Sequence, residues 1–175
     1  MTSHRFGLIV IAAAFLLWAP MSPVAAEGPS AAEQQTLLSL HNSYRAQHCV
    51  PPLAWSAELA ASAQAWANKC SLMFHSPRGR SPRERYSENL AWGGDRPASS
   101  AVDAWYKEVD GYNFSKPGFV SGLGHFTQMI WKNTKQLGCG VASCYLGTVR
   151  FWVCHYAPQG NWPDQFVQNV PRRCK

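Results

Sequence analysis

The sequence lacks the short motifs by which many enzymes and metalloproteins are identified. It contains no G-x-S-x-G and no H-E-x-x-H segment, which argues against the common serine-hydrolase and zinc-protease patterns. No two of its six cysteines form a C-x-x-C pair, and this absence argues against a thiolate metal site. Neither an internal repeat nor a low-complexity tract occurs. Any catalytic or metal-binding site must therefore be built from residues that do not belong to these common motifs.

The sequence has one long apolar stretch, residues 6–19, which directly follows the positively charged Arg5. Val24-Ala25-Ala26 then supplies the small residues of a cleavage site. The stretch is shorter than the ~20 apolar residues of a membrane span, and no second one follows, so an uncleaved anchor is the weaker alternative. We expect residues 1–26 to be a signal peptide and residues 27–175 to be a soluble, secreted, extracellular protein.

Acidic residues are few compared with basic ones. The chain has 16 Lys and Arg against 10 Asp and Glu, which gives a formal net charge of +6. This balance favours an anionic surface, such as a membrane or an acidic polysaccharide, although simple solubility is the commoner reason for it. No nucleic-acid-binding motif accompanies the charge, so we expect no nucleic-acid partner. We expect a monomer or a weak dimer.

All six cysteines lie after the expected cleavage site. An even number of cysteines in an exported chain indicates three disulfides, while the count leaves their connectivity open. The residues are Cys49, Cys70, Cys139, Cys144, Cys154 and Cys174.

The pattern of apolar residues and caps predicts three helices in the first two thirds of the chain. Helical spacing indicates the first over residues 33–47, ending before Pro51-Pro52. Ser56 caps a second helix that extends to about Asn68. A third is expected from Ser100 to about residue 110, because Ser100 to Asp103 resembles a capping box.

Strands are predicted late in the chain. After a short helix over residues 125–132, residues 138–144 and 148–156 read as two strands joined by a turn at 145–147. Residues 71–87 and 111–124 read as loops. Helices first and paired strands late, in a chain of one-domain length, predict an α+β domain.

Two segments together resemble the signature motifs of a known family. They are Gly124–Trp131, which reads GHFTQMIW, and Cys154–Trp162, which reads CHYAPQGNW. The pair resembles the CAP superfamily, the SCP/TAPS domain of cysteine-rich secretory proteins, antigen 5 and plant pathogenesis-related class 1 proteins. The resemblance implies a three-layer α-β-α sandwich with a small antiparallel sheet over residues 34–163. Residues 27–33 would then be a polar lead-in and residues 164–175 a C-terminal tail.

The resemblance also implies a disulfide pattern. It pairs Cys70 with Cys144 and Cys139 with Cys154. Cys49 and Cys174 then remain for a third bridge, which would tie the tail to the end of the first helix.

Four residues around one cleft are implied by the resemblance: His75, Glu88, Glu108 and His125. Each Glu can accept a hydrogen bond from a His, which orients the other ring nitrogen into the cleft. His75 and His125 could then bind Zn²⁺ or another divalent cation weakly, with Glu88 and Glu108 behind them. The alternatives are acid–base catalysis by the same four residues, as in a peptidase, and a purely structural polar network. Ser76, next to His75, is a poor nucleophile because adjacent residues rarely have the required geometry.

An aromatic loop precedes His125, and it resembles the loop with which relatives bind sterols. Its rings, Tyr112, Phe114 and Phe119, could cover an apolar ligand, or they could fold back into the core. Residues 77–85 form an arginine-rich insertion relative to plant members of the family. It could attract sulfated or phosphorylated ligands, although a solvated loop is the commoner explanation.

The remaining polar residues of the motifs are expected to be structural. Asn42 and Arg45 would bind backbone carbonyls, His41 would be a satisfied core histidine, and Asn161 would bond local backbone. We therefore expect a non-catalytic binding protein for a sterol or fatty acid. The rival functions are a secreted hydrolase and a defence or interaction protein that acts on membranes or cell walls.

Overall fold

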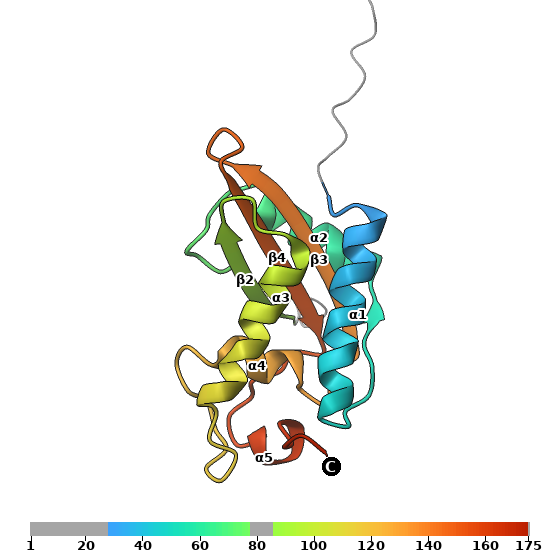
Figure 1. Cartoon of the computed structure of the whole chain (residues 1–175), viewed down its shortest axis with the longest axis vertical. Helices are drawn as coiled ribbons and strands as arrows, with labels where there is room; N and C mark the ends of the chain where they lie inside the picture. Colours follow the sequence, from blue (N-terminus) through green and yellow to red (C-terminus); the bar gives the residue numbers. More distant parts are fainter. Residues whose placement is uncertain (1–27, 78–85, 175) are drawn as a thin grey trace, which may run out of the picture.

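The computed structural model describes residues 28–77 and 86–174. The expected signal peptide and most of the arginine-rich insertion lie outside the described residues. None of the helices in the described part is long and apolar enough to cross a membrane. Figure 1 shows the elements in chain order: α1 (Ala31–Gln47), β1 (Ala54–Trp55), α2 (Ala57–Ala67), β2 (Ser87–Gly93), α3 (Ala98–Lys107), the 3₁₀ helix η1 (Glu108–Gly111), α4 (Gly124–Met129), β3 (Gln136–Cys144), β4 (Val149–Ala157) and α5 (Phe166–Asn169).

The sheet lies between helices in a three-layer arrangement, as the family resemblance implies. Its strand order is β1-β3-β4-β2, and it is antiparallel except for the two-residue β1, which pairs in parallel with β3. Helix α2 covers one face, while α1 and α3 lie over the other (Figure 1). The two expected strands are present as β3 and β4, and each is shifted by no more than two residues.

Strand β2 was not predicted from the sequence, which assigned Ser87 to a loop. Its first five residues are all buried, so both faces of the strand are covered. A strand buried on both faces has no apolar–polar alternation, and the period-2 signal is therefore missing. This strand carries Glu88, so the omission also concealed the surroundings of that carboxylate.

The helix starts depend on local capping. A full capping box between Ser30 and Glu33 begins α1, two residues before the predicted start. Ser56 caps α2 as expected, by accepting a hydrogen bond from Leu59 N. The predicted cap at Ser100 is wrong, because α3 begins at Ala98 after Pro97, and the Asp103 carboxylate instead accepts a hydrogen bond from Tyr44 at 2.7 Å.

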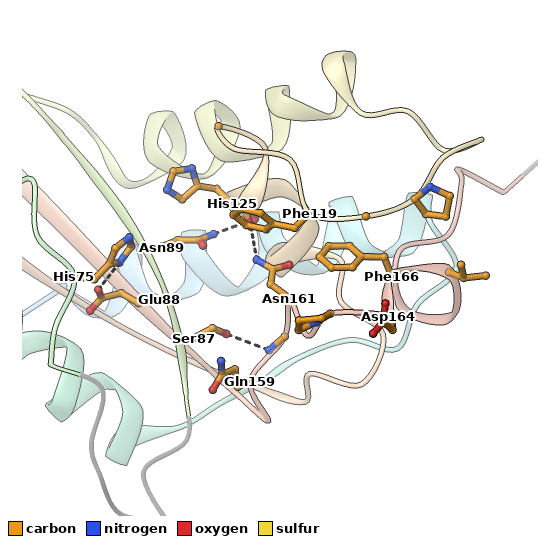
Figure 2. Close-up of a pocket in the computed structure, with 17 residues that line it drawn as sticks. His75, Ser87, Glu88, Asn89, Phe119, His125, Gln159, Asn161, Asp164 and Phe166 are labelled. Carbon is orange, nitrogen blue, oxygen red and sulfur yellow. Dashed lines mark hydrogen bonds and ion pairs between the residues drawn. The ribbon is translucent and has the colours of Figure 1, made fainter.

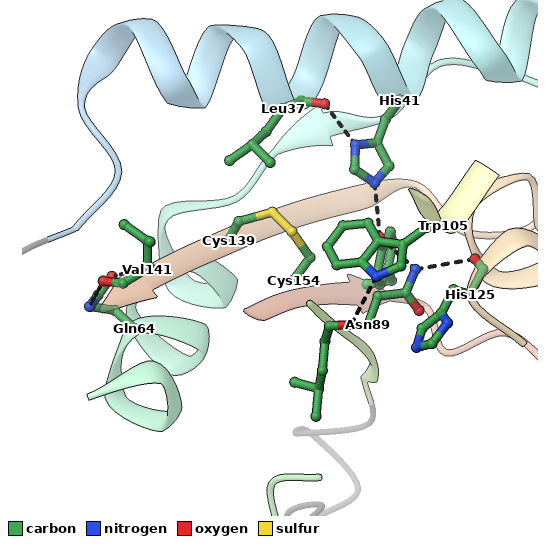
Figure 3. The surroundings of a disulfide bond; sticks show 11 residues. Leu37, His41, Gln64, Asn89, Trp105, His125, Cys139, Val141 and Cys154 are labelled. Atoms are coloured by element: carbon green, nitrogen blue, oxygen red, sulfur yellow. Dashed lines mark hydrogen bonds between the residues drawn. A yellow bond between two sulfur atoms is a disulfide. The ribbon is translucent and has the colours of Figure 1, made fainter. Parts of the chain in front are cut away.

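Helix α2 lies unusually close to β3 because two residues of that strand have no side chain. A Cβ at Gly138 would lie 2.2 Å from Ala60 N, and one at Gly140 would lie 2.4 Å from Gln64 Cα. Gln64 fastens the contact by bonding both backbone groups of Val141, at 2.7 and 2.9 Å (Figure 3). Apolar side chains complete this face: Ala63, Ala67, Leu90, Ala142, Cys144, Phe151 and Val153.

The opposite face buries large rings together with polar groups of α1. The guanidinium of Arg45, fully buried, donates to the carbonyls of Pro51, Met129, Trp131 and Thr134 at 2.7–3.1 Å. The ring of His41 bonds Leu37 O at 2.7 Å and the Tyr156 hydroxyl at 2.8 Å (Figure 3). Asn42 bonds both backbone groups of Leu53. These residues therefore have the structural roles expected of them.

Three disulfides close the structure: the two pairs that the resemblance implies and the third pair that then remained. Cys139–Cys154 joins β3 to β4 on the face of the sheet that α1 and α3 cover (Figure 3). Cys70–Cys144 connects the segment after α2 to the end of β3. Cys49–Cys174 holds the C-terminal tail against the end of α1.

Candidate functional site

The first half of the site is a histidine held by a strand carboxylate. His75 Nδ1 donates to Glu88 Oε1 at 2.8 Å, and the backbone N–H of Ser76 donates to the same oxygen at 3.0 Å. The Glu88 side chain is 1% exposed, whereas that of His75 is 52% exposed. A rigid, buried acceptor therefore orients an accessible imidazole.

A third histidine, which the sequence did not point to, binds the other oxygen of Glu88. Residues Glu88 and His155 are register partners in β2 and β4, and His155 Nε2 donates to Glu88 Oε2 at 2.9 Å. Tyr86 stacks on the His155 ring, with centroids 3.9 Å apart. Without β2 in the predicted sheet, nothing in the sequence could have placed His155 opposite Glu88.

The carboxylate of Glu88 is ionised despite its burial. Burial by itself raises its pKa, but the hydrogen bonds donated by His155, His75 and Ser76 outweigh it and lower the pKa to about 2. The site therefore contains a permanent negative charge behind His75 at neutral pH.

The second half of the site is also a histidine held by a carboxylate, and it is formed by His125 and Glu108. His125, in the first turn of α4, donates from Nδ1 to Glu108 Oε1 at 2.6 Å. Glu108, at the start of η1, uses its other oxygen to accept the Phe126 N–H at 3.0 Å. In both halves a histidine N–H engages one carboxylate oxygen while the second oxygen is held elsewhere, and each histidine keeps Nε2 free of described partners.

Both histidines line one cleft of about 910 Å³. Figure 2 shows His75, Glu88 and His125 toward one end, Phe166 and Asp164 toward the other, and Phe119 and Asn161 between them. The lining is partly apolar, through Pro117, Phe119, Pro163, Phe166 and Val167, and it contains no Lys or Arg among the described residues.

The two signature segments meet at the cleft wall. Asn161 donates to Gly124 O at 2.9 Å and accepts from the Thr127 hydroxyl at 2.7 Å, so it links the second segment to α4. The expectation of a local backbone bond for Asn161 is therefore wrong. Asn89 adds a further link, because its amide donates to both His125 O and the Tyr156 hydroxyl at 3.1 Å.

The aromatic loop folds mostly inward, which corrects one prediction. Tyr112 is buried, and its ring packs edge-on against Phe114 and Phe126. Phe114 is half-buried and also packs edge-on against Phe126. Only Phe119, which is 65% exposed, lines the cleft. The core alternative therefore holds for Tyr112 and Phe114, because Phe126 of α4 gives these rings an apolar partner.

No aligned nucleophile accompanies the histidines in the described part of the chain. The Ser76 hydroxyl lies 3.4 Å from the Tyr86 hydroxyl, not against His75. All six cysteines are in disulfides. The described groups gathered here can accept and donate protons or hold a cation, and none of the described hydroxyls or thiols contacts either histidine.

Comparison of the sequence with known proteins identifies the family of the chain. Residues 38–156 match the model of the CAP family, described as the cysteine-rich secretory protein family, and the chain belongs to this family. Its relatives include the Golgi-associated plant pathogenesis-related protein 1 of Homo sapiens, 42% identical over 151 residues, covering 82% of this chain and 96% of that protein. Pathogenesis-related protein 1 of Arabidopsis thaliana is 35% identical over 165 residues, which cover 94% of this chain and 96% of that protein.

Solved structures show the same fold. The crystal structure of NaASP2 with Zn²⁺ has a TM-score of 0.70 and 24% identity, and covers 85% of this chain and 89% of that one. The structure of Schistosoma mansoni venom allergen-like protein 4 has a TM-score of 0.64 and 26% identity, and covers 82% of this chain and 95% of that one.

Proposed function

We propose that the protein is a secreted, non-catalytic CAP-domain protein whose cleft binds a small apolar ligand, a sterol or a fatty acid, and can hold a divalent metal ion. The observation that carries the proposal is the composition of the cleft. Two oriented imidazoles share it with an exposed aromatic ring and other apolar side chains. Export is supported by the apolar leader and by three disulfides, which form in oxidising compartments.

The donor set fits a weakly bound Zn²⁺ or similar ion. A histidine that donates its other N–H to a carboxylate is the usual arrangement behind a metal ligand, and His75 and His125 both have it. Two protein ligands are fewer than a catalytic or structural zinc uses, and the described residues contain no group of three or more potential ligands. Water would complete the coordination of the ion. A bound ion would supply a Lewis acid for an oxygen atom of the sterol or fatty acid.

The apolar ligand would contact Phe119. This ring is one of the most exposed large hydrophobic side chains described, and it stands in the cleft instead of the core. Covering such a ring with a ligand removes apolar surface from water, which is worth roughly 1.5–3 kcal/mol for a full side chain. The absence of Lys and Arg from the described lining favours a neutral sterol over an anionic fatty acid when no metal is bound.

Binding of labelled cholesterol and labelled palmitate to the oxidised protein tests the ligand. We expect saturable binding that Phe119→Ala weakens about tenfold, the equivalent of about 1.4 kcal/mol. Phe74→Ala is the matched control, because Phe74 is 70% exposed and lies outside the cleft lining. Failure of both lipids to bind the wild type would exclude the lipid function, and equal losses in the two variants would place the ligand elsewhere.

Titration with Zn²⁺ tests the metal site. We expect weak binding that the double substitution His75→Phe with His125→Phe abolishes, while Phe119→Ala leaves it unchanged. Binding that survives the double substitution would show that the ion uses other residues.

A further inference from the structure

We infer that His155 is a positioning residue, which fixes Glu88 as the acceptor for His75 and so keeps the Nε2 of His75 available to the cleft. The part of this inference that concerns metal affinity rests on the proposed function. The part that concerns the protonated nitrogen of His75 stands independently of it.

The geometry joins three segments through one carboxylate. Glu88 Oε1 accepts from His75 Nδ1 at 2.8 Å and from Ser76 N at 3.0 Å, and Glu88 Oε2 accepts from His155 Nε2 at 2.9 Å. His155 and the Glu88 side chain are 0% and 1% exposed, so water does not compete for the Oε2 contact. If the imidazole of His155 were absent, Oε2 would be a buried, charged acceptor with no described partner, which is costly. The carboxylate would then gain by turning away from its present position.

The tautomer of His155 follows from its surroundings. Its Nε2 must carry the proton, because a carboxylate only accepts. Its Nδ1 is buried and has no hydrogen-bond partner among the described residues. The stacked Tyr86 ring covers one face of the imidazole. The ring therefore donates in one direction only, toward Glu88.

The second half of the site shows why this contact matters. At Glu108 the second oxygen is held by the backbone N–H of Phe126, which no substitution short of proline removes. At Glu88 the corresponding oxygen depends on the side chain of His155. The orientation of His75 is thus sensitive to one buried residue far from it in the sequence, whereas that of His125 is not.

Two substitutions distinguish the role of His155 as a hydrogen-bond donor to Glu88 from its role in packing against Tyr86. In His155→Phe the ring can keep its stack on Tyr86 while the donor is lost. In His155→Gln the side-chain amide nitrogen can reach the position of Nε2 and restore the donor. The readouts are the tautomer of His75, from long-range ¹H–¹⁵N spectra of the imidazoles, and the affinity for Zn²⁺.

We expect the wild type to show His75 protonated at Nδ1 and His155 protonated at Nε2. In His155→Phe, we expect His75 to lose its single tautomer and the Zn²⁺ affinity to fall about 10- to 100-fold, the range typical of removing a group behind a metal ligand. His155→Gln should keep the Nδ1–H form of His75 and an affinity within about threefold of the wild type.

The inference would be overturned if His155→Phe left the tautomer of His75 unchanged, or if His155→Gln disturbed it as much as His155→Phe. Should His155→Phe not fold, the wild-type spectrum still decides, because a His155 protonated at Nδ1 contradicts the proposed contact. A wild type that binds no Zn²⁺ would remove the metal part of the proposed function, while the tautomer measurement would continue to test His155.

Discussion

On the α2 side of the sheet the packing is made by closely spaced backbone and apolar side chains, whereas on the α1 and α3 side large rings pack together with buried polar groups. The α2 cluster is wholly apolar in its described members, and the helix approaches within the space that Gly138 and Gly140 leave. The other side buries Arg45, His41, His48 and Asn89. The polar side ties α1 to the segment that follows α4, through Arg45. Glu88 lies on the α2 side of the sheet, because it is two residues from Leu90 in β2. Both faces therefore contribute to stability and to the geometry of the site.

Substituting Arg45 should break the polar face most severely. Arg45→Met keeps most of the side-chain volume but leaves four carbonyl oxygens without their donor. Each buried acceptor left unpaired costs roughly 1–3 kcal/mol before relaxation. We expect a loss of about 4 kcal/mol in the free energy of unfolding, measured by urea denaturation. Lys135→Met is the control, on an exposed residue that follows Thr134, and it should change the free energy of unfolding by less than about 0.5 kcal/mol.

A methyl group on β3 should break the apolar face almost as strongly. Gly138→Ala places Cβ 2.2 Å from the backbone nitrogen of Ala60, which cannot move without shifting α2. Overpacking of this kind costs typically 1–3 kcal/mol, and a backbone obstacle places this case near the top of that range. Gly94→Ala is the control, because its Cβ would meet no atom within 4 Å. Equal urea midpoints for the two variants would contradict the close approach of α2.

Acid should lower the free energy of unfolding through buried titratable groups. Burial and the nearby Arg45 lower the pKa of His41 from 6.5 to about 4. Between these pH values the unfolded chain binds a proton that native His41 does not, so stability falls as the pH falls, by up to about 1.4 kcal/mol per pH unit. Glu88, with its pKa lowered from 4.5 to about 2, continues the same trend in that lower window.

Urea denaturation at pH 7, 5.5 and 4.5 measures this dependence. His41→Phe removes one of the two buried histidines whose pKa is lowered, the other being His48, so its unfolding free energy should change less over that range than that of the wild type. An identical pH dependence in the two proteins would show that His41 does not carry the effect.

The smallest expected change in the free energy of unfolding comes from comparing two rings of one loop, Phe119 in the cleft wall and Phe114 in the core. Phe119→Ala should change the free energy of unfolding by less than about 0.5 kcal/mol, because the ring is 65% exposed. Phe114→Ala should cost about 2 kcal/mol, because that ring packs against Phe126 and His48. Comparable losses, measured by thermal unfolding, would mean that Phe119 also belongs to the core.

The elements that were predicted correctly from the sequence are those whose signals lie in local patterns, such as β4 and the start of α2. The alternation over residues 148–156 identified β4, and Ser56 marked the start of α2, because both signals lie within a few neighbouring residues. The four cleft residues and two of the three disulfide pairs came from the family resemblance, and the structure brings those four residues into two hydrogen-bonded pairs.

What the sequence did not predict depends on contacts between distant segments. His155 acts on Glu88 through the register of β2 and β4, and Asn161 reaches a carbonyl in α4. The inward fold of Tyr112 and Phe114 depends on where Phe126 lies in space. No local period or cap records such pairings, so the sequence pattern could not distinguish a core ring from a ligand-facing one.

The disulfide between Cys49 and Cys174 has a further consequence for proteolysis of the protein. It spans 125 residues and encloses the two other disulfides, so nearly the whole domain is a closed covalent ring. A protease that cuts one peptide bond anywhere between residues 50 and 173 opens this ring without separating it into two molecules. The nicked product keeps its mass on a non-reducing gel, because the disulfide still joins its two fragments.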